Sequence, residues 1–525
     1  MVGFLGLLPA MQRGIALWQG DAPKLVIYKN NMSLLKKLAG ETAIYGLSSI
    51  VGRVLNYLLV PLYTNIFLRE EYGIVTQLYA WVAFLMVIYI YRMDTAFFRF
   101  GTQRKERERV FSTTFWAVAG SALVFSALIF YYSEAIARWY VLPDSGAGYI
   151  RIFALVLAYD TLSEIPLARL RLEGRAMRFA TIRLTGIALN IGLNLFFLLV
   201  CPWLLEHGYG VGFLRAIYNP FGGIGYIFIS NLIASAAVLL MLLPEIRLVR
   251  WHFDTRQWKT MATWSAPLVL AGLAGIVNEM IDREMLVRLL PFDIETNRGQ
   301  QGVYSACYKL AMLMSLFTQA FRYAAEPFFF ANAKNKDAKI LYADVAKYFT
   351  IAGVLAFLFI NFYIDIFKYF IGKDYWEGLG VVPVLLMANL FLGLYYNVSI
   401  WFKLTDQTMK GGVIAIGGAI VTIALNYWWI PLIGYTGSAW ATLLCYLFMT
   451  VVSWRWGRKY YPVAYDVRRI AFYVLLGLGL FATSVLLGKM PFFGQQMLYT
   501  ANSLLFIVFL FVTWRLEKQS LKNIL

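Results

Sequence analysis

The chain has 525 residues, of which 60% are hydrophobic and only 14% are charged, and its mean hydropathy is +0.63. A soluble globular protein of this length does not have such a composition, so the sequence predicts a polytopic membrane protein. The apolar runs are too long for the alternating strands of a membrane β-barrel and predict an all-α bundle. Basic loops that set topology and contact anionic lipid explain the net charge of +18, and we expect no nucleic-acid partner.

Cysteine and histidine usage gives no sign of a metal centre or a disulfide framework. Cys201, Cys307 and Cys445 lie far apart, each in or beside an apolar run, and are interpreted as small core residues. The only histidines are His207 and His252. We therefore predict no metal ligands, no catalytic residues and no bound cofactor.

The first 31 residues differ from the rest of the chain. They contain one short apolar stretch that cannot span a membrane and no obvious small-residue cleavage site. Met32 then opens a segment that resembles a natural start. Residues 1–31 are predicted to be a poorly packed extension or a mis-assigned start.

The remaining chain divides into about 14 apolar runs of membrane-spanning length. They are predicted near residues 38–62, 73–98, 110–133, 149–170, 179–201, 222–244, 262–290, 301–324, 343–365, 379–402, 411–430, 435–456, 469–488 and 494–514. Lysine and arginine concentrate in every second connection, while the alternate connections are short and poor in net positive charge. The positive-inside rule then places both termini in the cytoplasm.

Two similar stretches indicate an internal duplication. Arg92 lies in the segment 91–100 and Arg322 in the segment 321–330, and each segment ends an apolar run that begins at a Tyr-Gly or Gly-Val-Tyr signal. Six spans separate the two arginines, so the copies point the same way across the membrane and form a parallel repeat. We predict a first six-helix bundle over residues 32–250, a second over 251–460, and two additional helices with a cytoplasmic tail over 461–525.

Ionisable residues inside the spans are the candidate functional groups, because a charge is costly in the membrane interior. The candidates occur in neighbouring pairs on five spans: Arg53 with Asn56, Arg92 with Asp94, Asp160 with Glu164, Asp282 with Arg283, and Arg322 with Glu326. Each has a purely structural alternative. Arg322 is close enough to the cytoplasmic boundary to snorkel, Asp282 and Arg283 could lock helices together, and Asp160 and Glu164 could simply neutralise arginines.

The order of several short motifs resembles the polysaccharide transporter family, the O-antigen and capsule repeat-unit flippases of the multidrug, oligosaccharidyl-lipid and polysaccharide flippase superfamily. The resemblance runs from about residue 38 to the end of the fourteenth span. It rests on residues 46–53, 61–64, 71–73, 282–283, 302–306, 326–327, 425–426 and 430–437. None of these motifs is a catalytic signature, and the insertion at 202–221 departs from the expected short connection.

The resemblance implies a transporter and not an enzyme. It implies two six-helix bundles plus two helices, alternating access in the bacterial inner membrane, and export of an undecaprenyl-diphosphate oligosaccharide for surface polysaccharides such as lipopolysaccharide. Guanidinium groups suit a diphosphate, so Arg53, Asn56, Arg92, Arg283 and Arg322 are predicted to contact substrate. Asp94, Asp160, Glu164, Asp282 and Glu326 are predicted to hold the arginines or to exchange a coupling cation.

Other functions stay open at this stage. A multidrug or cation antiporter of the same superfamily would need an acidic, aromatic cavity, and a peptidoglycan-precursor flippase would differ chiefly in substrate. A membrane glycosyltransferase would show a large outer loop with acidic catalytic residues, whereas the longest outer loop here, near 201–221, has only Glu206 as an acid. Membrane lipids are expected partners. The sequence leaves open the identity of the sugar, coupling to Na⁺ or H⁺, the resting conformation, the oligomeric state and any partnership with polysaccharide polymerase machinery.

Overall fold

The computed structural model describes residues 51–102, 106–212, 214, 218–219, 222–333, 337–491 and 494–524, and it is helical throughout its regular elements. Within helices, the side chains of 324, 326–327, 330–332 and 519–524 fall outside the description. The predicted extension at 1–31 also lies outside the described residues. The chain is an all-α membrane protein, as its composition predicted.

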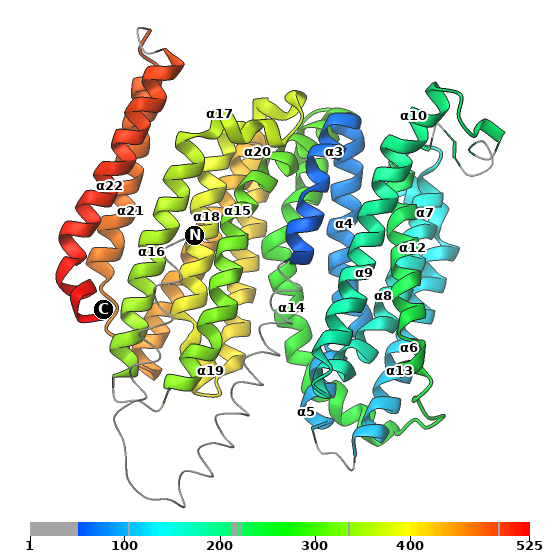
Figure 1. Ribbon diagram of the computed structural model, residues 1–525. Helices are drawn as coiled ribbons and strands as arrows, with labels where there is room; N and C mark the ends of the chain where they lie inside the picture. Colours follow the sequence, from blue (N-terminus) through cyan, green and yellow to red (C-terminus); the bar gives the residue numbers. More distant parts are fainter. Residues whose placement is uncertain are drawn as a thin grey trace, which may run out of the picture.

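The first half of the chain forms a group of roughly parallel and antiparallel helices (Figure 1). Residues 51–57 are helical and lead into the first labelled helix. The elements that follow are α3 (Leu59–Ile66), α4 (Arg69–Ile90), α5 (Met93–Phe100), α6 (Arg107–Tyr131), α7 (Ser133–Trp139), α8 (Gly146–Leu172), α9 (Ala176–Leu195), η2 (Phe196–Val200), α10 (Cys201–Glu206), α12 (Gly225–Met241) and α13 (Leu243–Ile246).

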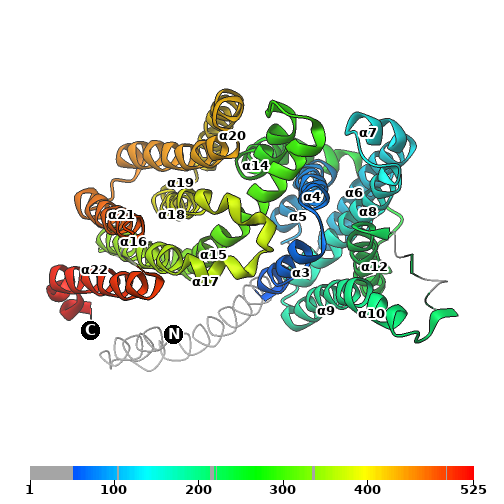
Figure 2. The same cartoon turned by 90° about the horizontal axis from the view of Figure 1, so that it is seen from above.

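The second half forms another group, with two helices added at its edge. Its elements are α14 (Thr255–Leu289), α15 (Ile294–Asn332), α16 (Ala338–Phe362), α17 (Ile364–Phe367), η4 (Lys368–Phe370), η5 (Lys373–Val381), α18 (Val382–Val398), α19 (Ile400–Leu404), α20 (Thr408–Tyr460), α21 (Val467–Gly488) and α22 (Gln495–Ile524). Helices α21 and α22 pack on α16 at the outer edge of this group (Figure 2).

Each predicted span from 73–98 onward coincides with a described helix or helix pair. By length and hydropathy, nine described helices could cross a membrane. One of them, α20, contains two spans because its backbone leaves the helical conformation at Ile433 and Gly434, just after Pro431. Proline removes a backbone donor and the φ of +62° at Gly434 suits glycine, so the sequence itself explains this turn. Of the other spans, α8 and α15 carry ionisable residues and α12 has only 17 residues.

Viewed from above, the two groups lie side by side with α14 next to α4 and α5 (Figure 2). Helix α14 belongs partly to each group. Its longest contact is with α20, yet near its start the indole of Trp258 donates a 3.1 Å hydrogen bond to the hydroxyl of Tyr91, and Met261 packs in an apolar cluster with Met93 and Phe97. The bundle boundaries predicted at residues 250 and 460 stay a prediction.

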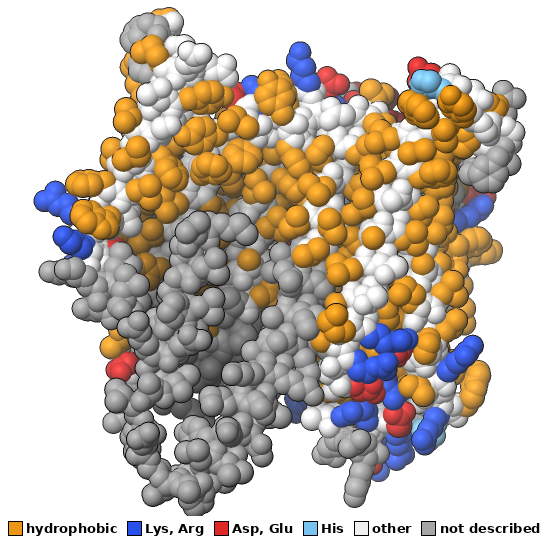
Figure 3. Space-filling model, in the orientation of Figure 1, with side chains coloured by type: hydrophobic (Ala, Val, Ile, Leu, Met, Phe, Trp, Pro, Cys, Tyr) orange, Lys and Arg blue, Asp and Glu red, His pale blue; other side chains and the backbone are white. Residues whose placement is uncertain are grey.

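Basic side chains gather at one end of the first group, at the connections that follow α5, α8 and α13 (Figure 3). We call this the basic end. Ion pairs occur there too: Arg169 contacts Glu108 at 2.6 Å, and Arg178 contacts the buried Glu245 at 2.7 Å. A broad apolar surface covers the molecule beyond this end, as lipid contact requires (Figure 3).

Helices α4 and α15 run parallel and touch closely at the end opposite the basic end. A Cβ atom added to Gly73 would lie 2.3 Å from the carbonyl oxygen of Arg298, and one added to Gly302 would lie 2.2 Å from that of Arg69. Only glycine permits such a backbone approach. We call this contact the α4–α15 crossing. Arg92 follows Gly73 by nearly the same number of residues as Arg322 follows Gly302, so the two arginines lie at similar depth, as the repeat predicted.

Further polar contacts join the two groups near the crossing. Glu284 of α14 accepts hydrogen bonds from Gln77 at 2.8 Å and from Trp81 at 3.0 Å, both on α4, and pairs with Arg288 at 2.8 Å. The amide of Gln301 donates to the hydroxyl of Thr76 at 2.9 Å. The two groups are therefore closed against each other at the end opposite the basic end.

Candidate functional site

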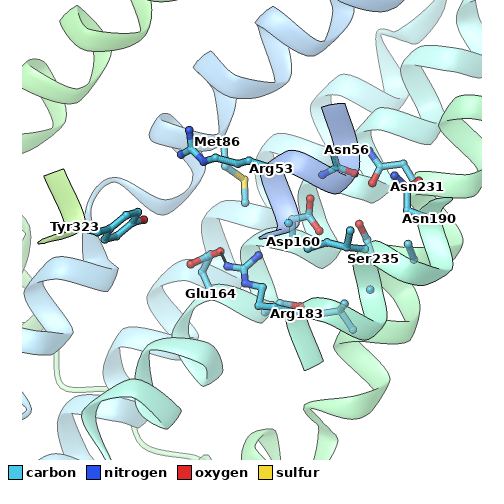
Figure 4. A pocket seen from close by; sticks show the side chains of 16 residues that line it. Arg53, Asn56, Met86, Asp160, Glu164, Arg183, Asn190, Asn231, Ser235 and Tyr323 are labelled. Atoms are coloured by element: carbon cyan, nitrogen blue, oxygen red, sulfur yellow. Dashed lines mark hydrogen bonds and ion pairs between the residues drawn. The ribbon is translucent and has the colours of Figure 1, made fainter. Parts of the chain in front are cut away.

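A polar pocket of about 460 Å³ lies in the first group of helices. Its walls come from the helix at 51–57 and from α4, α8, α9 and α12, with Tyr323 of α15 reaching it from the second group (Figure 4). The residues whose side chains give it polar character are Arg53, Asn56, Asp160, Ser163, Glu164, Arg183, Asn190, Asn231, Ser235 and Tyr323. This volume is typical of small-molecule sites in proteins.

Four residues predicted from the sequence meet in this pocket. Arg53 and Asn56, three residues apart, occupy the same face of their helix, and Asp160 and Glu164 stack one turn apart on α8. The guanidinium of Arg53 points toward the side on which Tyr323 lies (Figure 4). Arg53 is solvent-exposed, and the described part of the chain offers it no ion-pair partner.

Arg183 on α9 is a pocket residue that the sequence-based prediction missed. It pairs with Glu164 at 2.6 Å, as the dashed line in Figure 4 marks. The sequence did contain a pattern that could have identified it. Residues at three- and four-residue intervals share one face of α9, namely Arg183, Ile187, Asn190 and Asn194. Its position near the predicted start of a span made it resemble a boundary arginine.

Helix α12 supplies the opposite wall, which the sequence-based prediction also missed. Ser235 lies close enough to Asp160 to act on its carboxylate, and the amide of Asn231 donates to the hydroxyl of Tyr79 at 3.1 Å. Asn231 and Ser235 are four residues apart, which is the spacing that should have pointed to a polar face on this otherwise apolar helix. Glu164 therefore forms the direct ion pair with Arg183, while Asp160 lies near both Ser235 and Arg183.

Arg92 and Asp94 lie outside the pocket, where the second predicted span is broken. Tyr91 and Arg92 have φ angles of +35° and +59°, a conformation that side chains with a Cβ adopt at a cost, and they separate α4 from α5. The guanidinium of Arg92 packs over Gly272 of α14, where an added Cβ would lie 2.5 Å from its Nη2. Asp94 falls in the first turn of α5, where a negative charge is favourable.

Asp282 and Arg283 form a buried pair in the second group. Their exposed fractions are 3% and 5%, and their charged atoms are 2.7 Å apart. Tyr304 donates to the second carboxylate oxygen of Asp282 at 2.7 Å, and Arg283 also donates to the carbonyl of Glu279 and lies over the ring of Tyr308. Neither residue lines the pocket, and this arrangement matches the helix-locking alternative. The predicted substrate role of Arg283 stays a prediction.

Arg322 lies on α15 and packs against α18 within the second group. Its guanidinium carbon is 5.1 Å from the centre of the Tyr396 ring, and a small cavity beside it is lined by Tyr396 and Lys403. Tyr396 is close enough to Arg322, Glu279 and Arg53 to be influenced by all three charges. The side chain of Glu326 lies outside the described residues, so its predicted role stays a prediction.

Taken together, the site is a polar pocket inside a membrane protein, with cationic groups on its side toward the second group of helices. Groups of this kind can hold a polar or anionic head group away from lipid. These features are typical of a membrane transporter that handles polar cargo.

Comparison with known proteins defines the family. The profile of the polysaccharide biosynthesis protein family matches residues 38–332, which is more than half of the chain. The chain belongs to this family. A comparison with curated protein sequences finds no match.

Solved structures with the same fold are known. One, described as lipid II flippase MurJ in an inward closed conformation, has a TM-score of 0.67 at 14% identity, covering 89% of this chain and 98% of that one. A MATE-family multidrug transporter of the MOP superfamily in its inward-facing conformation gives 0.60 at 13% identity, covering 80% and 94%. An outward-facing structure of a transporter of the same family gives 0.54 at 13% identity, with the same coverage. At such identities the likeness shows the fold alone.

Proposed function

We propose that the protein is a flippase that moves a lipid-linked oligosaccharide, with an undecaprenyl-diphosphate carrier, across the bacterial cytoplasmic membrane for surface polysaccharide assembly. The observation that carries the proposal is the polar pocket beside the exposed Arg53, within a member of the polysaccharide biosynthesis protein family. A head group of sugars and phosphate needs a polar route through the bilayer, while its polyprenyl tail needs none.

The basic end faces the cytoplasm in this proposal, because positive charge is retained on that side. The α4–α15 crossing then closes the outer side, so the conformation described here accepts substrate from the inner leaflet. Rocking of the two groups about this contact would expose the pocket to the other side.

Export of cationic drugs is the less favoured function. A site for cations needs an excess of negative charge, whereas the described lining of this pocket has two carboxylates and two arginines. The exposed Arg53 and the partly exposed Arg322 would repel such a cargo. Their geometry suits phosphate oxygens, which guanidinium groups bind in a bidentate manner.

Reconstitution tests the proposal directly. Proteoliposomes would receive lipid-diphosphate oligosaccharide in one leaflet, and its appearance in the other leaflet would be followed with an impermeant glycosidase or lectin. We expect wild-type protein to accelerate transfer, and Arg53→Ala and Arg92→Ala to slow it. Transfer no faster than in protein-free liposomes would remove the proposed function, and undiminished transfer in both variants would remove the arginines from it.

A further inference from the structure

The polar pocket is balanced in charge. Among the described residues that line it, Arg53 and Arg183 are cationic and Asp160 and Glu164 are anionic, so their formal charges cancel. Glu164 neutralises Arg183 directly at 2.6 Å. The guanidinium of Arg53 points toward the side of Tyr323 (Figure 4), and the carboxylate of Asp160 lies within electrostatic range of the Arg183–Glu164 pair. A diphosphate placed deep in this pocket would meet carboxylates at close range in a poorly screened environment.

The uncharged groups of the pocket match a different kind of ligand. They are the amides of Asn56, Asn190 and Asn231 and the hydroxyls of Ser163 and Ser235. Amides and hydroxyls both donate and accept hydrogen bonds, and a carboxylate accepts from hydroxyl groups. Sugar rings present many hydroxyl and acetamido groups with both capacities and no charge. The volume of about 460 Å³ is also within the range of small-molecule sites.

Cationic groups lie on the side of the pocket toward Tyr323. The guanidinium of Arg53, which lines the pocket, points to this side (Figure 4), the guanidinium of Arg322 lies over the ring of Tyr396, and Lys403 lines the small cavity beside Arg322. Glu279 is an acid in the same neighbourhood. Among the described side chains here, the cations Arg53, Arg322 and Lys403 outnumber it, which suits a diphosphate.

We propose that the head group binds in two parts: the charge-balanced pocket around Asp160 takes one or two sugar residues, and the diphosphate stays between Arg53, on the Tyr323 side of the pocket, and Arg322, beyond it. This inference rests on the proposed function and names which chemistry each half of the site recognises. The pocket distinguishes sugar-bearing lipid from bare lipid diphosphate, while the arginines bind both alike.

Binding measurements on the purified full-length protein in nanodiscs test the division. The two probes are the lipid-linked oligosaccharide pool extracted from the producing cells and undecaprenyl diphosphate without sugar. The variants are Asp160→Asn and Asn56→Ala within the pocket and Arg53→Ala on its Tyr323 side. The matched control is Asp144→Asn, at an exposed acid just before the start of α8. Thermal unfolding confirms that each variant is folded before its affinity is compared.

Wild-type protein and the control should bind the sugar-bearing pool more tightly than the bare lipid. Asp160→Asn should weaken binding of the pool by about ten- to a hundred-fold, because a charged hydrogen-bond acceptor is lost, and leave the affinity for bare lipid unchanged. Asn56→Ala should act in the same direction with a smaller change, and Arg53→Ala should weaken both.

Two results would overturn the division while leaving the flippase proposal standing. They are an equal loss of affinity for both probes in the pocket variants, and wild-type protein that does not discriminate between the probes. If wild-type protein binds neither probe, the proposed function itself fails. The two failures are therefore distinguishable in a single experiment.

Discussion

The α4–α15 crossing makes a sharp prediction about the conformation of the outer side. In Gly302→Ala, the new methyl group would begin 2.2 Å from the carbonyl oxygen of Arg69, and the backbone atoms there cannot turn aside as a flexible side chain would. The two helices must separate by about 1 Å to reach ordinary contact distances. Overpacking of this kind costs about 1–3 kcal/mol. The closed state should lose that much relative to the outward-open state.

A thiol placed behind the crossing measures the effect. Ala80 is 7% exposed and lines a small cavity between α4 and α14. In a background without the three native cysteines, Ala80→Cys should react slowly with an impermeant reagent added from the outer side. When opening is fast relative to modification, the rate follows the open population. Adding Gly302→Ala should then raise the rate about 5- to 150-fold, since 1.4 kcal/mol corresponds to a factor of ten.

The matched control is Gly120→Ala on α6, where an added Cβ meets nothing within 4 Å. Both substitutions increase helix propensity by about 1 kcal/mol, so the control removes this contribution from the comparison. An unchanged modification rate in Gly302→Ala would refute the claim that the crossing holds the outer side closed. An equal acceleration in both variants would attribute the effect to helix propensity, and it would also refute the claim that the crossing holds the outer side closed.

Three further predictions concern stability, each read from unfolding in detergent. Asp282→Asn leaves Arg283 buried without its charge partner and should lower the free energy of unfolding by about 3–5 kcal/mol. Arg53→Ala should leave the melting temperature nearly unchanged. Equal stability of the two variants would contradict these roles. Glu517 is 1% exposed and pairs with Lys347 at 2.8 Å and with Arg469 at 3.0 Å. Glu517→Ala should therefore lower the free energy of unfolding by about 3–5 kcal/mol. The control Glu134→Ala, which removes an exposed ion pair, should lower it by less than about 1 kcal/mol. Asp254 caps the start of α14, and its pKa is lowered by the backbone N–H of Gln257 and by Arg109, so the stabilisation is fully present above the unfolded pKa of the carboxyl and is lost as the pH falls through the folded pKa. The stability difference between wild type and Asp254→Ala should therefore shrink only below about pH 4. A difference that vanishes near neutral pH would contradict the capping role.

The membrane architecture was readable from the sequence because lipid imposes a simple rule on it. Every span must form its own backbone hydrogen bonds within a run of apolar residues. The spans from α4 onward, and the break between two spans at Pro431 and Gly434, could therefore be predicted from the sequence. The depth of Arg92 and Arg322 followed from the repeat. Local spacing also identified two faces of the pocket, the one with Arg53 and Asn56 and the one with Asp160 and Glu164.

The features that were not predicted depend on contacts between segments far apart in the sequence. Local residue spacing carries no information about such contacts. The pairing of Arg183 with Glu164 joins α9 to α8, and the aromatic cradle around Arg283 joins α14 to α15. The break at Tyr91 and Arg92 contains neither glycine nor proline, so no local signal announced it. It is held instead by packing against α14, where Gly272 leaves room for the arginine.

The central claim is that the substrate head group enters the pocket of the first group of helices. A lipid-diphosphate oligosaccharide carrying a photoreactive group on its sugar, added to reconstituted protein, tests it most directly. After illumination, we expect mass spectrometry to find crosslinks on peptides of α8, α9 and α12 around Asp160, Asn190 and Ser235. Crosslinks confined to the second group, around Asp282 and Arg283, would contradict it.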